Sequence, residues 1–573
     1  MNMEKRTGSQ VVMEALARHG VETIFGYPGG VILPLYDEML KWPQIDHILV
    51  RHEQCAAHMA DGYARATGKV GVCLGTSGPG ATNLVTGIAT AIMDSVPMLV
   101  LTGQVNSWAI GKDAFQEVDI QGITIPITKH NYLVTNVDDL PYIMAEAFYL
   151  ANTGRKGPVH VDIPKDVFQA LTDAPFPETV HRRGYTIPGA APLTDIERAA
   201  EMVNQAERPI ANAGAGVIWS ETAPFIRNLA EKADLPIINS LLGLGAIDRQ
   251  DPRSLGMMGM HGEAAATIAV QEADLVIGIG NRFDDRLTGK TSGFAPKAEI
   301  IHFDIDPTEF GKCVRTMHVV PGDLTHNLPA FVEAVKPAKR KTWWGEIRQW
   351  QEEYPLVIPE DGRFLARHVM KGLNDCTGGN AIVSTDVGQH QMWAAQFYQF
   401  KRPYQWLSSG GLGTMGFGFP AAMGAKFACP DQEVWAIVGD GGFQMTLQEL
   451  QTAFECKLDV NIALINNGYL GMIRQWQELF YDDRQSHSSM GNPDYAKLAE
   501  AYGVHFVRCD NAADLPAAVE AARTTKGPSL VEFVVAMEEN VYPMVAAGAS
   551  NDNLIMDPAL ARSDAESLMG AQP

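Results

Sequence analysis

Apolar runs that end in small or polar residues recur along the chain, and amphipathic segments separate them. The clearest case starts with the apolar run 433–438, continues with an apolar stripe at helical spacing over 446–454, and ends with the apolar run 460–465. This pattern predicts a buried strand, a helix and a second buried strand. Polar residues follow both strands, and open parallel sheets bind their ligands beyond the carboxyl ends of the strands. We therefore expect a ligand at this corner of the sheet.

The same alternation extends over most of the chain. An amphipathic helix is predicted over 8–19 and a strand over 21–25, and strands and helices then alternate up to the apolar run 159–163. Further strands are predicted near 208–214, 274–280, 299–306 and 381–385, and a proline-containing, uncharged stretch at 188–193 reads as a linker. We therefore predict an α/β fold of three doubly wound parallel-sheet domains, at 1–180, 190–340 and 360–550, followed by a C-terminal tail at 551–573.

Composition and charge narrow the class of protein. A chain of 573 residues is too long for one hydrophobic core. Its formal net charge of −22 argues against nucleic acid and anionic membranes as partners. Seven scattered cysteines without a Cys-x-x-Cys pair indicate reduced thiols in a cytoplasmic protein and no zinc site. The sequence also contains no signal-peptide-like apolar region and no apolar run of membrane-spanning length.

The polar residues after the strands at 433–438 and 460–465 suit a metal and a diphosphate. Asp440 offers a carboxylate and Asn467 an amide oxygen, and the backbone carbonyl of Tyr469 can supply a third oxygen, a set of the kind that holds Mg²⁺. The glycines of 439–442 let the backbone approach a diphosphate. An isolated Gly-Asp-Gly is more often a turn with a capping Asp. The pair of asparagines at 466–467, which begins 26 residues after Asp440, favours the metal interpretation.

This Gly-Asp-Gly and Asn-Asn pair resembles the thiamine diphosphate (ThDP) motif of ThDP-dependent enzymes. ThDP reacts only after its own amino group, in the imino form, has removed a ring proton, and a carboxylate bonded to the aminopyrimidine N1′ promotes that form. Glu53 lies at a predicted strand-to-helix junction, where a glutamate is often just favoured by the helix dipole. The needs of ThDP make it the candidate activating carboxylate.

Longer motifs extend the resemblance to nearly the whole chain. Segments 26–30, 51–54, 62–68, 76–83, 113–119, 128–130 and 161–166 are similar to those of the acetohydroxyacid synthase (acetolactate synthase) large subunit. Four positions depart from the residues usual in that family: Cys55 for Gly, Lys112 for Thr, Ala213 for Val and Ala215 for Gly. None of them removes a reacting group, although Cys55 stands beside Glu53.

The resemblance implies a set of active-site residues: Glu53, Phe115, Gln116, Lys129, Arg282, Met415 and Trp476. Met415 would wedge between the two rings of ThDP, although methionine is usually core filler. Arg282 would hold the carboxylate of a second ketoacid through paired hydrogen bonds. Trp476 matches the residue that favours 2-ketobutyrate as acceptor, although a helical tryptophan is more often core than ligand.

The resemblance also implies three cofactors, namely ThDP, Mg²⁺ and FAD. The expected ThDP and metal residues are Tyr27, Pro28, Gly29, Glu53, Val387, Gly388, Gln389, His390, Gly413, Met415, Gly439, Asp440, Gly441, Gly442, Asn467, Tyr469 and Met472. The expected FAD residues are Arg155, Gly214, Ala215, Gly216, His261, Gly262, Gly280, Arg282, Asp284, Arg286, Asp304, Ile305, Gly322 and Asp323. A lone Gly-x-Gly at 214–216 is weak evidence by itself. The segments 539–545 and 548–551 resemble the family's C-terminal active-site cover.

The implied reaction is the decarboxylation of pyruvate and ligation of the two-carbon unit to pyruvate or 2-ketobutyrate, in branched-chain amino acid biosynthesis. The implied assembly is a homodimer or tetramer with a small regulatory subunit, and FAD would have no redox role. Three alternatives remain: a pyruvate oxidase-like enzyme, an FAD-free catabolic acetolactate synthase, and a catalytically silent nucleotide-binding subunit. The Phe115-Gln116 segment, Arg282 and Trp476 argue against the oxidase. The retention of Glu53, Asp440 and Asn467 argues against the silent subunit.

Overall fold

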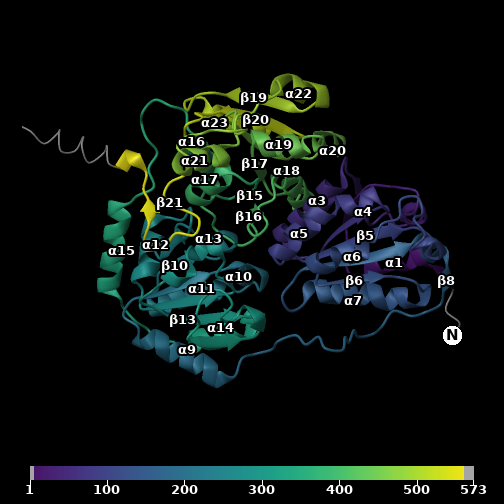
Figure 1. Cartoon of the computed structure of the whole chain (residues 1–573), viewed down its shortest axis with the longest axis horizontal. Coiled ribbons are helices and arrows are strands. Elements are labelled where there is room, and N and C mark those ends of the chain that lie inside the picture. The colour runs from purple at the N-terminus through teal and green to yellow at the C-terminus, as the bar shows by residue number, and fades with distance from the viewer. Residues whose placement is uncertain (1–4, 561–573) are drawn as a thin grey trace, which may run out of the picture.

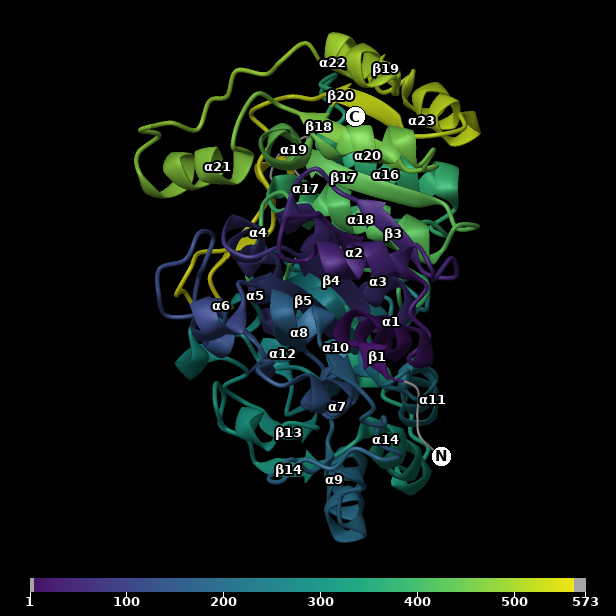
Figure 2. The same cartoon turned by 90° about the vertical axis from the view of Figure 1, so that its right-hand side faces the viewer.

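The computed structural model describes residues 5–560, and within them three six-stranded parallel sheets are each flanked by helices (Figure 1). The predicted α/β fold class is confirmed. The N-terminal sheet lies beside the other two, and the C-terminal sheet lies above the central one in both views (Figures 1 and 2). No helix among residues 5–560 is long and apolar enough to cross a membrane.

The N-terminal sheet has the order β3-β2-β4-β5-β7-β6. Its strands are β2 (Thr23–Gly26), β3 (Asp46–Leu49), β4 (Gly71–Gly75), β5 (Met98–Gln104), β6 (His130–Leu133) and β7 (Pro158–Pro164). Its helices are α1 (Gly8–Arg18), α2 (Leu33–Met39), α3 (Glu53–Thr67), α4 (Pro79–Asn83), α5 (Val85–Met93), α6 (Ile120–Thr124), α7 (Leu140–Asn152) and α8 (Lys165–Gln169). Short strands β1 (Arg6–Thr7) and β8 (Leu171–Thr172) pair beside it, and a long connection runs from β8 to the central sheet (Figure 1).

The central sheet has the order β11-β10-β9-β12-β13-β14. Its strands are β9 (Pro209–Ala213), β10 (Ile237–Asn239), β11 (Ser254–Met257), β12 (Leu275–Ile279), β13 (Glu299–Asp304) and β14 (His318–Pro321). Its helices are α9 (Leu193–Gln205), α10 (Ala215–Trp219), α11 (Ala223–Ala233), α12 (Ala264–Glu272), α13 (Asp285–Thr288), α14 (Leu324–Ala334) and α15 (Lys341–Glu353). This order is the one typical of dinucleotide-binding sheets.

The C-terminal sheet, of order β16-β15-β17-β18-β20-β19, repeats the topology of the N-terminal sheet. Its strands are β15 (Ile382–Thr385), β16 (Trp406–Ser408), β17 (Val434–Gly439), β18 (Asn461–Asn466), β19 (His505–Cys509) and β20 (Ser529–Val534). Its helices are α16 (Ala366–Thr377), α17 (Gln389–Phe397), α18 (Gly418–Ala428), α19 (Asp440–Thr446), α20 (Glu449–Glu455), α21 (Gly471–Phe480), α22 (Tyr495–Tyr502) and α23 (Leu515–Thr524). In the predicted tail, β22 (Leu554–Ile555) pairs with β21 (Met544–Val545), and 561–573 lie outside the described residues.

Two predicted helices differ in extent from the observed ones. The helix expected after the predicted junction at Glu53 includes Glu53 as its first residue, because the His52 ring accepts the backbone N–H of Gln54 at 3.2 Å and so caps the first turn. The helix expected over 446–454 is instead two short helices, α19 and α20, and α19 begins directly at Asp440. Both shifts bring the candidate carboxylates to the first turn of a helix.

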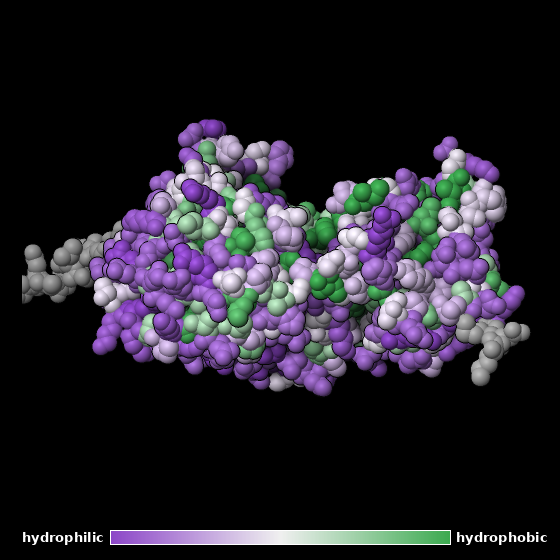
Figure 3. Space-filling view, turned by 90° about the horizontal axis from the view of Figure 1, so that it is seen from below, coloured by the Kyte–Doolittle hydropathy of each residue, from purple (hydrophilic) through white to green (hydrophobic). Residues whose placement is uncertain are grey.

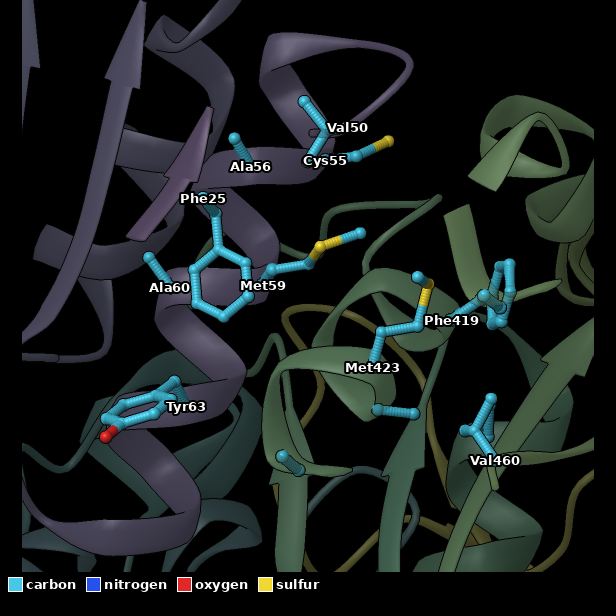
Figure 4. Close-up of a cluster of buried hydrophobic side chains, with 14 of the residues drawn as sticks. Phe25, Val50, Cys55, Ala56, Met59, Ala60, Tyr63, Phe419, Met423 and Val460 are labelled. Atoms are coloured by element: carbon cyan, nitrogen blue, oxygen red, sulfur yellow. The ribbon is translucent and has the colours of Figure 1, made fainter. Parts of the chain in front are cut away.

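One hydrophobic core joins the N-terminal and C-terminal sheets. Helices α3 and α18 lie face to face, with Met59 and Met423 side by side between them (Figure 4). Glycines allow this close approach, because a Cβ atom on Gly62 would lie 2.0 Å from the carbonyl oxygen of Ala421. The two domains therefore pack as one body around α3.

Candidate active site

The site of the C-terminal sheet lies where the strand order reverses, between β15 and β17. Helix α17 starts just after β15 and α19 starts directly after β17, so two helix N-termini point to the same corner. A Cβ atom on Gly439 would lie 3.0 Å from the His390 ring, so a larger residue would crowd that ring. Free N–H groups at helix N-termini attract phosphate groups, and this corner therefore suits a diphosphate.

Asp440 is the carboxylate of this corner and is 2% exposed. Its Oδ2 atom accepts hydrogen bonds from the backbone N–H of Gly468 and from the Asn492 side chain, both at 2.8 Å. Burial raises the pKa of Asp440. The Gly468 bond holds the turn that carries Asn467 and Tyr469 against the carboxylate, and all three predicted metal ligands line one cavity. Oxygen ligands of this kind suit Mg²⁺.

That cavity has a volume of about 580 Å³ and joins the C-terminal sheet to the central sheet. It brings together the predicted residues Ala215, His261, Gly280, Arg282, Asp284, Arg286, Val387, Gly388, Gln389, His390, Gly413, Met415, Gly439, Asp440, Gly441, Gly442, Asn467, Tyr469, Met472 and Trp476. Viewed from below, the molecule also has a hollow between the N-terminal domain, at the right, and the rest of the chain, and hydrophobic residues gather there (Figure 3).

Several buried polar atoms around the cavity lack a hydrogen-bond partner among the described residues. They are Nε2 of His390, Oε1 of Gln389, Nδ1 of His261 and Nε1 of Trp476. Buried polar atoms in native proteins are nearly always paired. Their convergence on one cavity indicates that a polar ligand completes the site, so the residues present fit a bound cofactor.

Met415 and Trp476 both line this cavity. Met415 lies on the loop between β16 and α18, and a Cβ atom on Gly441 would lie 3.6 Å from its Cε atom. Trp476 lies on α21 and contacts Phe480 edge-on, with the ring centres 5.7 Å apart. Neither side chain is core filler, since both line the cavity.

The central sheet contributes its own switch point, between β9 and β12. Gly214 and Gly216 pack against Gly280, where a Cβ atom on Gly216 would lie 2.7 Å from the Gly280 Cα atom. Arg282 follows and forms no hydrogen bond or ion pair within residues 5–560, so its guanidinium group is free to bind a carboxylate or phosphate. Asp284 caps α13 by accepting the backbone N–H of Arg286 at 3.1 Å.

The other predicted FAD residues do not line the cavity; they are Arg155, Gly214, Gly216, Gly262, Asp304, Ile305, Gly322 and Asp323. Arg155 instead bridges the N-terminal and central domains through ion pairs with Asp306 at 3.0 Å and Glu309 at 2.6 Å. Gly322, at φ +118°, packs on the linker, and Asp323 caps α14 by accepting the Thr325 N–H. These are contacts within one chain, and the role of these residues in FAD binding stays a prediction.

A second group of predicted residues lies at the switch point of the N-terminal sheet, between β2 and β4. The Asn83 side chain donates to Oε2 of Glu53 at 2.9 Å, and a Cβ atom on Gly80 would lie 3.2 Å from Oε1. Residues 27–29 adjoin them, since a Cβ atom on Gly29 would contact the Thr76 side chain. The Oγ atoms of Thr76 and Ser77 are buried without a partner among the described residues. We call this group the N-terminal half-site.

The N-terminal half-site is separate from the cavity that contains Asp440, because none of its residues lines that cavity. Gln116 belongs to it: its backbone has φ +61°, and its carbonyl oxygen would lie 2.9 Å from a Cβ atom on Gly78. The neighbouring Phe115 is 88% exposed. One chain therefore carries two half-sites, each with part of the predicted residues.

Lys129 does not lie in either half-site. Its ammonium group donates to the carbonyl oxygens of Leu150 and Thr153 and to the Tyr185 hydroxyl, which uses all three of its donors. Burial lowers the pKa of Lys129 to about 8. Within one chain these bonds hold the lysine at the end of α7, and its predicted active-site role stays a prediction.

Sequence reasoning missed one residue beside Asp440. The Asn492 side chain donates to both Asp440 and Asn466, each at 2.8 Å. Nothing in the sequence connects a residue 52 positions away to that carboxylate.

Comparisons with known proteins agree on one family. Three models of thiamine pyrophosphate enzymes match: the N-terminal TPP binding domain over 6–123, the central domain over 196–331 and the C-terminal TPP binding domain over 386–533. An acetolactate synthase of Mycobacterium bovis is 46% identical over 96% of this chain and 92% of its own length. The acetolactate synthase large subunit of Parasynechococcus marenigrum is 49% identical, covering 96% and 91%. That of Cyanidium caldarium is 45% identical, covering 97% and 98%.

Proposed function

Because this chain belongs to the acetolactate synthase large-subunit family of ThDP-dependent enzymes, we propose that it decarboxylates pyruvate and joins the remaining two-carbon unit to a second 2-ketoacid. The products are 2-acetolactate and 2-aceto-2-hydroxybutyrate, precursors in branched-chain amino acid biosynthesis. The observation that carries the proposal is the single cavity in which the Asp440 corner meets Arg282 and Trp476. We also expect a cytoplasmic location, because the seven scattered cysteines of the sequence indicate reduced thiols.

The C-terminal half of the site would hold the diphosphate end of ThDP. The N-termini of α17 and α19 and the unpaired Nε2 atom of His390 would contact the diphosphate, and Asp440, Asn467 and the Tyr469 carbonyl would hold Mg²⁺. When bound, ThDP supplies the carbon nucleophile and holds the electron pair released as CO₂ leaves. Met415, on the loop between β16 and α18, would wedge between the two rings of ThDP and so keep the cofactor bent.

Glu53 would hold the proton at N1′ of the aminopyrimidine. Asn83 fixes one oxygen of its carboxylate, which leaves the other to face the ring nitrogen. Glu53 is 9% exposed, so bulk water would not compete for the hydrogen bond by which it holds the N1′ proton. Its amide counterpart would lack this ability, so Glu53→Gln should bind ThDP and lose most activity, typically about 10²–10⁴-fold.

We infer that the active enzyme is at least a homodimer. Glu53 and Asp440 of one chain lie in separate half-sites, so a second copy would have to bring its Glu53 to the Asp440 cavity. Large hydrophobic side chains are exposed near the N-terminal half-site, with Phe115 88% and Trp108 68% accessible, which supports such an interface. In sedimentation with activity assays, the active enzyme should run as a dimer or larger, and any monomer should be inactive. A fully active monomer would refute this arrangement.

The central domain would complete the acceptor side. The free Arg282 guanidinium would bind the acceptor carboxylate, and Trp476 would contact its alkyl group. FAD would bind along the central switch point, where His261, Arg286 and Gly280 line the cavity, and it would have no redox role in this reaction. A small regulatory subunit is the expected additional partner.

A pyruvate oxidase-like activity is the second candidate, since the same cofactors would serve it. Arg282 and Trp476 line the cavity where an acceptor ketoacid would bind. This favours ligation, because an oxidase needs no acceptor ketoacid. Product analysis with pyruvate plus 2-ketobutyrate decides between them. We expect acetolactate and acetohydroxybutyrate with the flavin remaining oxidised, whereas bleaching of the flavin by pyruvate without oxygen would support the oxidase.

A further inference from the structure

We propose that Glu449 is a positioning residue that fixes Glu53 from the C-terminal domain of the same chain; this inference rests on the role proposed for Glu53. Glu449 is the first residue of α20 and is fully buried. It lies at the start of α3, although 396 residues separate it from Glu53 in the sequence. A buried carboxylate needs several hydrogen bonds to offset its desolvation.

The partners of Glu449 lie immediately before Glu53. Its Oε1 atom accepts the backbone N–H of Arg51 at 2.8 Å and that of His52 at 3.1 Å. These groups precede the first turn of α3, where the positive end of the helix dipole also favours a carboxylate. Its Oε2 atom accepts the Thr452 hydroxyl at 2.7 Å. The carboxylate therefore fixes the backbone from which the Glu53 side chain projects.

Cys55 closes the other side of this contact. Its thiol is fully buried against Glu449, and the Gln448 side chain lies 3.6 Å from its sulfur. Figure 4 shows the Cys55 side chain pointing from α3 toward the C-terminal domain. Burial raises the pKa of Glu449, and hydrogen bonds from Thr452, Arg51 and Cys55 oppose that effect.

The contact does not depend on side-chain ion pairing. Arg51 also forms an ion pair with Glu455 at 2.5 Å, but Glu455 is 51% exposed, and such pairs contribute little. Before Glu53, Glu449 binds the main-chain N–H groups of Arg51 and His52, and these cannot move without moving Glu53. A displacement of about 1 Å at a catalytic group can lower the rate by about 100-fold.

The test compares Glu449→Ala, Glu449→Gln and the matched surface control Glu455→Gln in the holoenzyme. We expect Glu449→Ala to lower kcat by about 10- to 100-fold, with the KM for pyruvate and the affinity for ThDP unchanged. Glu449→Gln keeps one acceptor oxygen and should rescue part of the loss, and Glu455→Gln should match the parent. The proton–deuterium exchange rate of the reactive carbon of bound ThDP, measured by NMR, should fall in the same order.

The outcomes separate the two proposals. If folded Glu449→Gln and Glu449→Ala exchange the proton at the parent rate, the positioning role is wrong; where Glu449→Ala does not fold, the isosteric Glu449→Gln decides alone. A merely structural role would lower the melting temperature and leave the exchange rate per bound ThDP intact. Glu53→Gln is measured alongside. If it retains full activity, the role of Glu53 itself fails, and if only the Glu449 variants stay active, the positioning inference fails alone.

Discussion

The carboxylate of Asp94, at the end of α5, accepts the backbone N–H of Gly411 at 2.7 Å. Its other oxygen accepts the Gly410 N–H at 3.1 Å and the Arg65 guanidinium at 2.8 Å. Gly410 and Gly411 begin the loop that carries Met415, so a residue of the N-terminal domain fastens a cavity loop of the C-terminal domain. Glu449 makes the reverse connection, from the C-terminal domain to the segment before Glu53.

We predict that Asp94→Ala lowers the free energy of unfolding by about 1–3 kcal/mol, because two backbone N–H groups and Arg65 lose a buried acceptor. Urea unfolding of parent and variant measures the loss. Asp375→Ala is the control, since that carboxylate pairs with Lys371 on the surface and should cost less than about 0.5 kcal/mol. Equal losses in the two variants would show that the Asp94 contacts contribute nothing special.

We predict that Asp440→Ala weakens ThDP binding by removing a metal ligand. In the parent, a chelator should lower the ThDP affinity measured by calorimetry, and excess Mg²⁺ should restore it. In Asp440→Ala the affinity should be low with or without the chelator. Asp482→Ala, which removes a surface carboxylate, should behave as the parent does. If Asp440→Ala still responds to Mg²⁺ as the parent does, the metal is bound elsewhere.

Burial of His160 should make the fold sensitive to acid. Its ring lies 2.6 Å from the Thr102 hydroxyl and 3.0 Å from that of Thr124, and burial lowers its pKa to about 3. The unfolded chain takes up a proton below about pH 6.5 while the folded chain does not, so stability is lost as the pH falls from there toward the folded pKa.

His160→Gln removes this proton uptake. The variant should therefore lose less stability than the parent between about pH 7 and pH 5, whatever its stability at neutral pH. Urea midpoints across that range test the slope. Parallel curves for the two proteins would mean that His160 titrates alike in the folded and unfolded chains.

The hydrophobic pattern of the sequence predicted the buried strands. The apolar runs 433–438 and 460–465 are β17 and β18 to within one residue, because a buried parallel strand is apolar on both faces. Asp440 and Asn467 follow those strands, and the topology alone brings strand ends to one edge. The local sequence pattern was therefore enough to predict that Asp440 and Asn467 lie at one corner of the sheet.

Contacts between domains could not be predicted from the local sequence pattern. The Glu449 bond to the Arg51 N–H spans 398 residues, and the residue types involved would equally suit a surface helix. Lys129 lies in a motif whose family resemblance predicts an active-site role, and that role stays a prediction. The motif did not show that the three donors of Lys129 are used at the end of α7 within one chain. The hydrogen-bond partners of a side chain can be carbonyl groups far away in the sequence, and a local pattern does not predict these.

The last prediction concerns the acceptor. Trp476 is held in place by its neighbour, because the Gln475 side chain donates to the Val541 carbonyl at 3.1 Å and accepts the Val541 N–H at 2.9 Å. The tryptophan thus forms a fixed wall of the cavity and should contact the ethyl group of 2-ketobutyrate. Pyruvate has only a methyl group there and leaves part of that contact unmade.

One methylene in an apolar pocket is worth about 1–3 kcal/mol, or roughly 10- to 200-fold in selectivity. Trp476→Leu should therefore lower the ratio of acetohydroxybutyrate to acetolactate when the two ketoacids compete. Total turnover should fall much less, since the indole ring takes part in neither proton transfer nor decarboxylation. Trp344→Leu, outside the cavity on α15, should leave the ratio unchanged. An unchanged ratio in a folded Trp476→Leu enzyme would mean that the acceptor binds against another wall.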